Sequence, residues 1–214
     1  MDGNRRWARE RGLPTLEGHR KAYEKVKEVS DWCKEAGIPN LVVYGFSTEN
    51  WNRAQEEVSY LMDLIREMLL RDAEEMKKRG GRMRIVGQRD RFAPDIQKAM
   101  QDAEEMTKDG THTLWLALSY GGRAEIAHAV NELLKEDKKE VTEADVTKKL
   151  WTKDMPDPDI IIRTSGEQRL SGFLPWQGVY SELFFIDTHW PAFSKEDFNT
   201  ILAQYAERER RMGK

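Results

Sequence analysis

Three short segments carry side chains that can bind phosphate groups. Met1–Trp7 places a carboxylate, a glycine and two guanidinium groups close together, while Phe46–Arg53 and Arg163–Ser171 each follow a strand-like apolar run. Guanidinium groups donate charge-assisted hydrogen bonds in a planar fork, and a carboxylate can hold a divalent cation against the same anion. The three segments together predict a site for a metal-bound, multiply charged anion.

Four arginines are the expected anchors of this anion: Arg6, Arg53, Arg163 and Arg169. Each charge-assisted hydrogen bond contributes about 1.5 to 3 kcal/mol, so the four could supply most of the binding free energy. A lone arginine is usually a solvated surface residue, but the placement of all four at predicted strand ends favours a site. Gly3 lets backbone amides approach a phosphate, and a helix beginning near Asn4 or Arg5 would point its positive end the same way.

The carboxylates assigned to a divalent ion are Asp2 and Glu182. Mg²⁺ takes one or two carboxylates and completes its shell with waters and phosphate oxygens. The sequence has no cluster of His or Cys suited to zinc. A single acidic residue is more often a helix cap or a surface charge. His19 has two possible roles: it could bind an anion or transfer a proton, or it could cap a helix.

The elements that must position these residues alternate between helix and strand. Apolar spacing predicts helices over about 17–35, 58–69, 94–108 and 124–134, a short helix capped by Thr142 and Asp145, and a C-terminal helix opened by Ser194 that ends in a highly charged turn. Apolar runs predict strands at 41–46, 83–86, 113–118, 159–163 and 183–186. Such alternation predicts a parallel sheet, whose ligand crevice lies outside the carboxyl ends of the strands. The loops predicted to bind phosphate can therefore converge on one pocket.

Length and composition bound the class of protein. A chain of 214 residues fits a single α/β domain, 1–214, with an open parallel sheet flanked by helices. The net charge of -3, with basic and acidic residues interspersed, gives no indication of nucleic acid binding. The single Cys33 cannot form an internal disulfide, so a cytoplasmic location is expected. No apolar run reaches the roughly 18 residues of a membrane span, so we expect any membrane contact to be peripheral.

Several longer segments resemble the cis-prenyltransferases, most closely the bacterial undecaprenyl diphosphate synthases. The matching segments are Met1–Ala8, Gly18–His19, Phe46–Arg53, Tyr120–Arg123, Arg163–Glu167, Phe173 with Trp176–Gln177, and Tyr180–Glu182. They occur in the family's order from Met1 to about Gly213. The resemblance implies a Mg²⁺-dependent enzyme that joins isopentenyl diphosphate in cis to an allylic diphosphate such as farnesyl diphosphate, makes a long-chain polyprenyl diphosphate and forms a homodimer.

The resemblance also implies roles for residues at the matching positions. Asp2 would hold Mg²⁺ and assist departure of the allylic diphosphate, with Glu182 contributing to the metal region. The residues implied to cradle the allylic diphosphate are Gly3, Asn4, Arg5, Arg6 and His19. The residues implied to bind the diphosphate of isopentenyl diphosphate are Arg163, Arg169 and Ser171. The residues implied to order the reacting ends are Ser47, Asn50, Trp51 and Arg53, with Asn50 counted as catalytic beside Asp2. Trp7, Thr48 and Glu49 complete the expected substrate-binding set.

The sequence departs from the family pattern at a few positions. The family has a short apolar strand before its Met-Asp-Gly-Asn segment, and this first strand is absent here, which we interpret as a misplaced start or a truncation. Thr15 stands where many relatives carry an arginine for the allylic diphosphate, so weaker allylic binding is expected. Ala54 replaces a usual proline and Ser119 a usual asparagine, and both changes are expected to be tolerated.

Two other functions and two structural alternatives stay open at the level of sequence. A non-catalytic partner subunit of a cis-prenyltransferase complex would typically lack the Asp-Gly-Asn loop and much of the Asn-Trp segment, both of which this chain keeps. A generic phosphate-binding module would not require Glu182 or the paired arginine loops. Trp51 and Trp176 could wall a pocket for an apolar tail or belong to the core, and Gly45 could leave room for a long ligand or ease strand packing.

Overall fold

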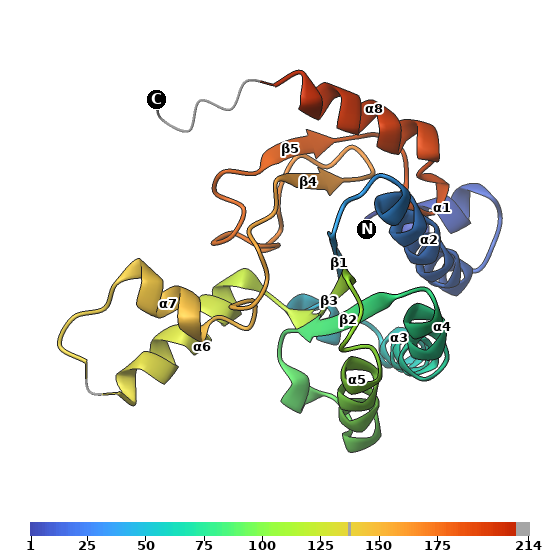
Figure 1. Cartoon of the computed structure of the whole chain (residues 1–214). Coiled ribbons are helices and arrows are strands. Elements are labelled where there is room, and N and C mark those ends of the chain that lie inside the picture. The colour runs from blue at the N-terminus through green and yellow to red at the C-terminus, as the bar shows by residue number, and fades with distance from the viewer. Residues whose placement is uncertain (137, 209–214) are drawn as a thin grey trace. The chain divides into compact units, whose positions relative to one another are not determined.

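The computed structural model describes residues 1–136 and 138–208. The chain is a mixed α/β protein, and its strands pair in parallel, three in the order β1-β3-β2 and two as β4-β5. Its contacts divide it into two compact units, Met1–Trp32 with Pro156–Lys214, and Cys33–Met155. The predicted α/β class with parallel strands and flanking helices is confirmed (Figure 1). The assignment of the whole chain to one domain stays a prediction.

The second unit, Cys33–Met155, holds the three-stranded sheet. Its strands are β1 (Asn40–Ser47), β2 (Gly81–Val86) and β3 (His112–Tyr120). Its helices are α3 (Gln55–Glu67), α4 (Ala73–Lys78), α5 (Pro94–Met106), α6 (Gly122–Leu134) and α7 (Glu143–Lys149), with the short 3₁₀ turns η1 (Thr48–Asn52) and η3 (Arg89–Arg91) and the π-helical segment η2 (Met68–Asp72) between α3 and α4. All residues of the central strand β3 are buried, as expected for a strand covered on both faces. The predicted strands and long helices of this region are confirmed.

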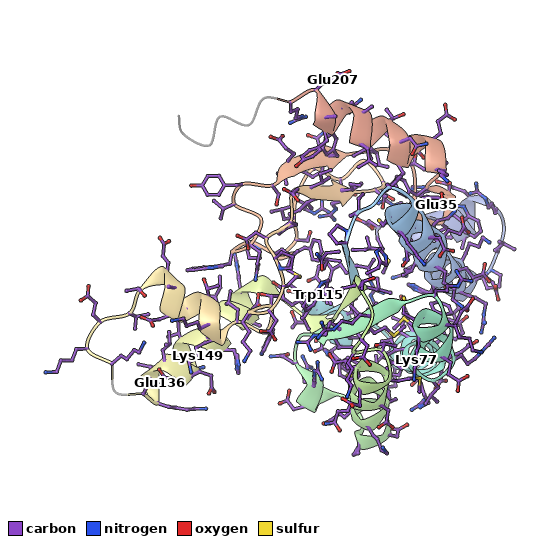
Figure 2. The ribbon with its side chains drawn as sticks, in the orientation of Figure 1. Glu35, Lys77, Trp115, Glu136, Lys149 and Glu207 are labelled. Atoms are coloured by element: carbon purple, nitrogen blue, oxygen red, sulfur yellow. The ribbon has the colours of Figure 1, made fainter. Side chains whose placement is uncertain are left out.

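The pairing of β1 with β3 is regular at the amino ends and irregular at the carboxyl ends. At the amino ends Trp115 Nε1 donates to Asn40 Oδ1 at 3.0 Å, and Figure 2 labels this tryptophan. Towards the carboxyl ends the register shifts twice, so that Gly45 is an extra residue in β1 and Ser119 an extra residue in β3. A Cβ on Gly45 would lie 2.9 Å from Leu118 Cδ2. The near contact is with a side chain of the neighbouring strand and not with a helix, and Gly45 itself is exposed, so both roles considered for it stay predictions. Bulges of this kind re-aim neighbouring side chains.

A buried carboxylate ties the end of β3 to the segment after α7. Glu125, on α6, is fully buried. Its Oε2 accepts from Tyr120 Oη at 2.6 Å, and its Oε1 accepts from Thr152 N at 2.9 Å and Thr152 Oγ1 at 2.8 Å. Burying a carboxylate is costly unless its oxygens are hydrogen-bonded, and these three donors meet that requirement.

The helices α6 and α7 pack against each other (Figure 1). As predicted, Thr142 caps α7: its Oγ1 accepts a hydrogen bond from Asp145 N at 3.3 Å, and its backbone N donates to Asp145 Oδ2 at 3.1 Å. Lys149, near the end of α7, forms an ion pair with Glu136 just beyond α6, and Figure 2 labels both. The capping box fixes where the short helix begins.

The first unit, Met1–Trp32 with Pro156–Lys214, holds the two-stranded sheet. Its elements are α1 (Asn4–Glu10), α2 (Thr15–Glu35, whose last residues belong to the second unit), β4 (Ile160–Arg163), β5 (Glu182–Phe185), η4 (Trp190–Ala192) and α8 (Lys195–Ala206). Ser194 opens α8 as predicted, and its side chain accepts from Asp197 N at 3.0 Å. The predicted charged turn after α8 falls largely on residues 209–214, which lie outside the described residues.

An aromatic cluster holds the helices of the first unit together. Trp190 stacks on Phe193 with centroids 5.7 Å apart, and Trp32 of α2 contacts Phe193 and Phe198 at about the same separation, 6.1 and 6.0 Å. Trp190 Nε1 also donates to the backbone oxygen of Ala22 at 2.9 Å. None of the helices over residues 1–136 and 138–208 combines the length and apolar character needed to cross a membrane.

Replacing Glu125 by alanine should destabilise the protein by about 3 kcal/mol, because the buried Tyr120 and Thr152 donors lose their acceptor. Urea denaturation followed by circular dichroism measures this loss. Glu132→Ala on the same helix is the matched control: Glu132 pairs with Lys135 at the surface, and removing such a pair should cost about 0.5 kcal/mol. Equal losses in the two variants would contradict the role given to the buried carboxylate.

Candidate active site

Asp2 is held between two arginines in the first unit. Its Oδ2 accepts from Arg163 Nη2 at 2.9 Å, its Oδ1 accepts from Gly3 N at 2.7 Å, and Arg6 Nη2 lies 3.7 Å from Oδ1. The backbone is fixed as well, because Thr164 Oγ1 bonds both Asp2 N and Asp2 O, at 2.9 and 3.0 Å. The carboxylate is therefore fixed beside the carboxyl end of β4.

The loop after β4 gathers further donors at the same place. Arg163, the last residue of β4, donates through Nη1 to Ser171 Oγ at 2.8 Å and to the backbone oxygen of Arg169. Arg169 in turn pairs with Glu167, and Glu167 Oε1 lies 3.6 Å from Arg6 Nη1. Three of the four predicted arginine anchors, Arg6, Arg163 and Arg169, thus lie around Asp2 and the loop after β4. Their guanidinium groups and the Ser171 hydroxyl form a concentrated set of anion donors.

The arginine partner also sets the ionisation of Asp2. Partial burial alone would raise the pKa of its carboxyl group, but the hydrogen bonds from Arg163 and from the backbone of Gly3, together with the Arg163 charge, outweigh it and lower the pKa. Asp2 is therefore a carboxylate at neutral pH, the form that can bind a cation.

A hydrogen-bonded row of side chains backs the Asp2-Gly3 turn. Ser165 Oγ lies 2.7 Å from His189 Nδ1, and His189 Nε2 lies 3.0 Å from Glu10 Oε1. This Ser-His-Glu order resembles that of a hydrolase, but Ser165 is only 5% exposed and Gly3 covers it: a Cβ on Gly3 would lie 1.9 Å from Ser165 Oγ. The row therefore supports the turn rather than presenting a nucleophile.

The other predicted residues of α1 and α2 lie around this centre in different environments. Asn4 is the first residue of α1, and its Oδ1 is shielded from solvent with no hydrogen-bond partner among the described residues. Trp7 is half-buried and stacks with the Arg11 guanidinium, whose Cζ is 4.6 Å from the ring centroid, whereas Arg5 is exposed. His19 is buried in α2, directly after Gly18, where a Cβ would lie 2.0 Å from Asn4 O.

Glu182 lies away from Asp2 within the same unit. It is the first residue of β5 and pairs in register with Ile160, whereas Asp2 contacts Arg163 at the other end of β4. Its carboxylate forms an ion pair with Arg208. Within the residues that the structure describes, no three His, Cys, Asp or Glu side chains group in a way that could hold a metal ion. In this chain Asp2 is therefore the one of the two assigned carboxylates that lies among the anion donors.

The Asn-Trp segment occupies the carboxyl end of β1 in the second unit. Asn50 Oδ1 accepts from Ser47 N at 3.0 Å, which closes the η1 turn. Trp51 packs edge-on against Phe46 and Phe92, with centroids 4.9 and 5.4 Å away, and its Nε1 donates to Ser119 Oγ at 2.9 Å. The turn therefore presents its side chains from a tightly fixed backbone.

The remaining predicted residues of this segment are held by local contacts. Arg53 Nη1 pairs with Glu57 Oε1 at 3.1 Å, and Glu49 is exposed. Thr48 packs closely on the loop after β3, because a Cβ on Gly121 would lie 2.5 Å from its Oγ1. Trp176, also considered as a pocket wall, is half-buried in the first unit.

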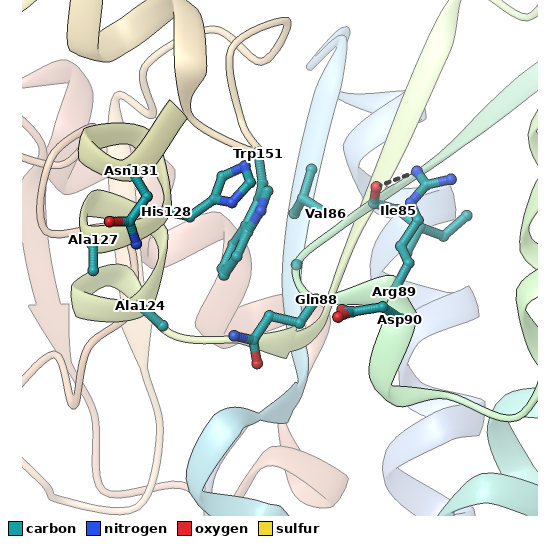
Figure 3. A pocket seen from close by; sticks show the side chains of 11 residues that line it. Ile85, Val86, Gln88, Arg89, Asp90, Ala124, Ala127, His128, Asn131 and Trp151 are labelled. Atoms are coloured by element: carbon teal, nitrogen blue, oxygen red, sulfur yellow. Dashed lines mark hydrogen bonds between the residues drawn. The ribbon is translucent and has the colours of Figure 1, made fainter. Parts of the chain in front are cut away.

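A cavity of about 670 Å³ lies at the carboxyl end of β2, between η3 and α6. Figure 3 shows His128 and Trp151 on one side of it, their rings 5.3 Å apart, and Gln88 and Asp90 on the other. Arg89 turns away to its own backbone partner, donating to Ile85 O at 2.6 Å. None of the predicted site residues lines this cavity.

Sequence reasoning gave no role to several residues that fix the centre. Thr164 and Ser165 fall inside the Arg163–Glu167 segment, but their part as backbone clamps depends on tertiary contacts. His189 and Trp190 follow the last strand, so the strand-end rule that located Arg163 could also have located them. Glu10 carries no such signal, because its contact with His189 spans most of the chain.

Comparisons with known proteins identify the family. The family model "Putative undecaprenyl diphosphate synthase" matches residues 1–213. The isoprenyl transferase of Thermotoga maritima is 46% identical over 218 residues, which cover 100% of this chain and 94% of that protein. The isoprenyl transferase of Aquifex pyrophilus is 43% identical, with 100% of this chain and 93% of the relative covered.

Two solved structures are similar over most of their length. The lavandulyl diphosphate synthase from Lavandula x intermedia, in complex with dimethylallyl diphosphate, has a TM-score of 0.95 and 30% identity, covering 100% of this chain and 95% of that one. A "probable undecaprenyl diphosphate synthase" from Campylobacter jejuni has a TM-score of 0.82 and 31% identity, with coverages of 91% and 93%. The chain belongs to the undecaprenyl diphosphate synthase family of cis-prenyltransferases. These relatives support an enzyme rather than a non-catalytic partner subunit.

Gly3→Ala should destabilise the protein by about 3 kcal/mol or more, because Gly3 has a φ of +88° and the added Cβ would meet Ser165 and His189. Gly12→Ala is the control: Gly12 has a φ of +65° but nothing within 4 Å of the new Cβ, so only the left-handed backbone costs, about 1 kcal/mol. Thermal denaturation of both variants gives the comparison. Similar losses would show that the Gly3 turn is not tightly packed.

Arg163→Gln should raise the pKa of Asp2 towards its ordinary value, because the hydrogen bond and charge that lower it are removed while the burial stays. In the parent, the stabilisation from ionised Asp2 is fully present above about pH 4 and is lost as the pH falls through the lower folded pKa. In the variant the smaller remaining contribution is lost at a higher pH. Carboxyl ¹³C NMR titration measures the midpoint. The control is Arg169→Gln, which removes a guanidinium bonded to Glu167 and should leave the titration midpoint of Asp2 unchanged. An equal midpoint in the parent and in Arg163→Gln would refute the claim that Arg163 lowers the pKa of Asp2.

Proposed function

We propose that this chain is a Mg²⁺-dependent enzyme that condenses isopentenyl diphosphate with an allylic diphosphate, farnesyl diphosphate, into a long-chain polyprenyl diphosphate. The observation that carries the proposal is the cluster of Asp2 with Arg6, Arg163 and Ser171 in the first unit. A single carboxylate set among guanidinium and hydroxyl donors suits a diphosphate carried with its cation. The prenyltransferases among the relatives support the same reaction class.

The side chains present fit a magnesium ion shared with a diphosphate. Mg²⁺ requires few protein ligands when phosphate oxygens and waters complete its shell, so Asp2 alone can serve as the protein carboxylate. The shielded Oδ1 of Asn4, which has no hydrogen-bond partner in the part of the chain that the structure describes, is a further acceptor, suited to a donor such as a water of that shell. When bound, the ion would supply positive charge to the diphosphate. Glu182 lies at the other end of the β4-β5 pair, where it pairs with Arg208, so this proposal gives the ion Asp2 as its carboxylate in this chain.

The chain's own residues favour departure of the allylic diphosphate. As the allylic C–O bond breaks, negative charge grows on the leaving oxygens, and guanidinium groups already fixed in place stabilise that state more than the ground state. Gly3, Asn4, Arg5, Arg6 and His19 form the proposed cradle of this group. Trp7, stacked on Arg11, supports the same helix. The relative from Lavandula x intermedia was solved with dimethylallyl diphosphate, itself an allylic diphosphate.

The second diphosphate belongs to isopentenyl diphosphate in this proposal. Arg163, Arg169 and Ser171 are its proposed ligands, and the hydrogen bond from Arg163 Nη1 to Ser171 Oγ, at 2.8 Å, holds two of them next to each other. The double bond of isopentenyl diphosphate then attacks the allylic carbon, whose bonding pair has left with the diphosphate, and the resulting carbocation loses a proton to form the new double bond of the product. The η1 segment in the second unit, including Ser47, Thr48, Glu49, Asn50, Trp51 and Arg53, would order the reacting ends.

We further propose that the enzyme acts as a homodimer in the cytoplasm and reaches the membrane only peripherally, through its lipid product. The resemblance to the family supports the dimer. Sedimentation velocity of the purified chain tests it, and a monomer at micromolar concentration would contradict it.

The activity test incubates the purified chain with farnesyl diphosphate, labelled isopentenyl diphosphate and Mg²⁺ and identifies the products by chromatography. A long polyprenyl product is expected, and its loss on adding EDTA with recovery on excess Mg²⁺ would support the metal. Asp2→Ala should reduce turnover at least about a hundredfold, because the leaving diphosphate loses its cation partner.

The matched control is Asp157→Ala, which removes an exposed carboxylate in the same unit and should leave turnover unchanged. Circular dichroism establishes that both variants fold. Activity of Asp2→Ala above about a tenth of the parent would exclude the proposed metal role. No labelled product from the parent chain would overturn the proposed function itself.

A further inference from the structure

Ser119 occupies an unusual position at the carboxyl end of β3. It is the extra residue of the bulge, between the pairs Phe46 with Leu118 and Ser47 with Tyr120. Its φ is +48°, in the left-handed region that residues with a side chain rarely adopt, and the residue is fully buried. A strained backbone at a bulge persists where the surrounding structure requires the side chain to point in one direction.

That direction is towards Trp51. The indole Nε1 donates to Ser119 Oγ at 2.9 Å. Phe46 and Phe92 make edge contacts with the ring, and the Arg91 guanidinium lies over it, 5.0 Å from the centroid. Apolar edge contacts permit a ring to slide or rotate in its slot, whereas a directional hydrogen bond fixes where the nitrogen edge points.

The backbone around Ser119 is itself anchored, so its hydroxyl is a fixed reference point. Ser119 O accepts from Gln88 N at 3.2 Å, at the rim of the cavity in Figure 3. The next residue, Tyr120, accepts from Tyr44 Oη at 3.0 Å and donates to the buried Glu125. The bulge therefore connects the rigid end of β3 to the η1 turn through the hydrogen bond from Trp51 Nε1 to Ser119 Oγ.

We propose that Ser119 is a positioning residue for prenyl transfer, whose hydroxyl oxygen sets the orientation of the Trp51 indole in the η1 turn. This role rests on the proposed function, in which Trp51 helps to order the reacting ends of the two substrates. Ser119 acts through Trp51 and not on the substrates. Its removal reduces kcat more than it changes KM, because the indole still forms the wall but no longer holds the transition-state geometry.

Three substitutions at one position separate the hydroxyl from the backbone strain. Ser119→Ala keeps the left-handed strain and removes the acceptor, Ser119→Gly removes both, and Ser119→Asn tolerates the left-handed region and supplies an amide oxygen as acceptor. If the hydroxyl orients Trp51, alanine and glycine both lower kcat about tenfold, the effect of about 1.4 kcal/mol, and asparagine restores it. If only backbone conformation matters, glycine retains full activity, and the proposal is overturned.

A double-mutant cycle tests whether the effect passes through the indole. Trp51→Phe removes the Nε1–H donor while keeping an aromatic wall, so adding Ser119→Ala to it should change kcat no further. An undiminished loss in the double variant would overturn the proposal. The control is Asn40→Ala, which removes the acceptor of the Trp115 indole at the other end of the same pair of strands and should leave kcat unchanged.

A spectroscopic signal separates this proposal from the proposed function. The indole ¹H–¹⁵N resonance of Trp51, assigned by its absence in Trp51→Phe, should shift in Ser119→Ala and Ser119→Gly and return towards the parent position in Ser119→Asn. A resonance that does not move in Ser119→Ala shows that the contact is absent and overturns the positioning role, whatever the activity. A parent chain without prenyl transfer overturns the proposed function and the positioning role together, whereas an active parent with unchanged kcat in both Ser119→Ala and Ser119→Gly overturns the positioning role alone.

Discussion

The pair formed by Asp2 and Arg163 is the interaction on which the candidate centre of the first unit depends. It joins the start of the chain to the end of β4, and the same arginine reaches Ser171 through its other nitrogen. Bringing three segments so far apart in sequence to one point costs conformational entropy, which directional charge-assisted bonds and the buried Thr164 clamp offset. In the proposed reaction Asp2 leaves Arg163 to bind the cation, and Arg163 binds a diphosphate. The ion pair between them therefore keeps the site ordered before the substrate arrives.

Backbone conformations that side chains disfavour gather at the carboxyl ends of strands in both units. Gly3 and Ser165 have positive φ beside β4, and Gly87 and Ser119 have positive φ after β2 and within the end of β3. Of these four residues only Ser165 and Ser119 carry a side chain, so only they are strained by a positive φ. Ser165 bonds His189 behind the Gly3 turn, and Ser119 bonds the Trp51 indole, so both strained residues hold a polar contact beside a predicted site residue.

The family relationship and the physical argument agree from independent starting points. Relatives at 43 to 46% identity share the whole length of this chain, so the same loops leave the same strand ends. Behind the Gly3 turn, His189 Nε2 lies 3.0 Å from Glu10 Oε1, a contact that supports the turn from the side away from the proposed anion donors.

The sequence by itself determined the order and type of the elements and the identity of the phosphate-seeking loops, because apolar periodicity and local composition are properties of neighbouring residues. The capping of α7 by Thr142 and the position of Arg163 at a strand end were both predictable on that basis. Only the tertiary structure decided the partners of each group. Glu182 pairs with Arg208 at the far end of β5, Ser165 lies against His189, and the bulge at Ser119 fixes Trp51. These depend on register and on contacts across many tens of residues, which no local pattern specifies.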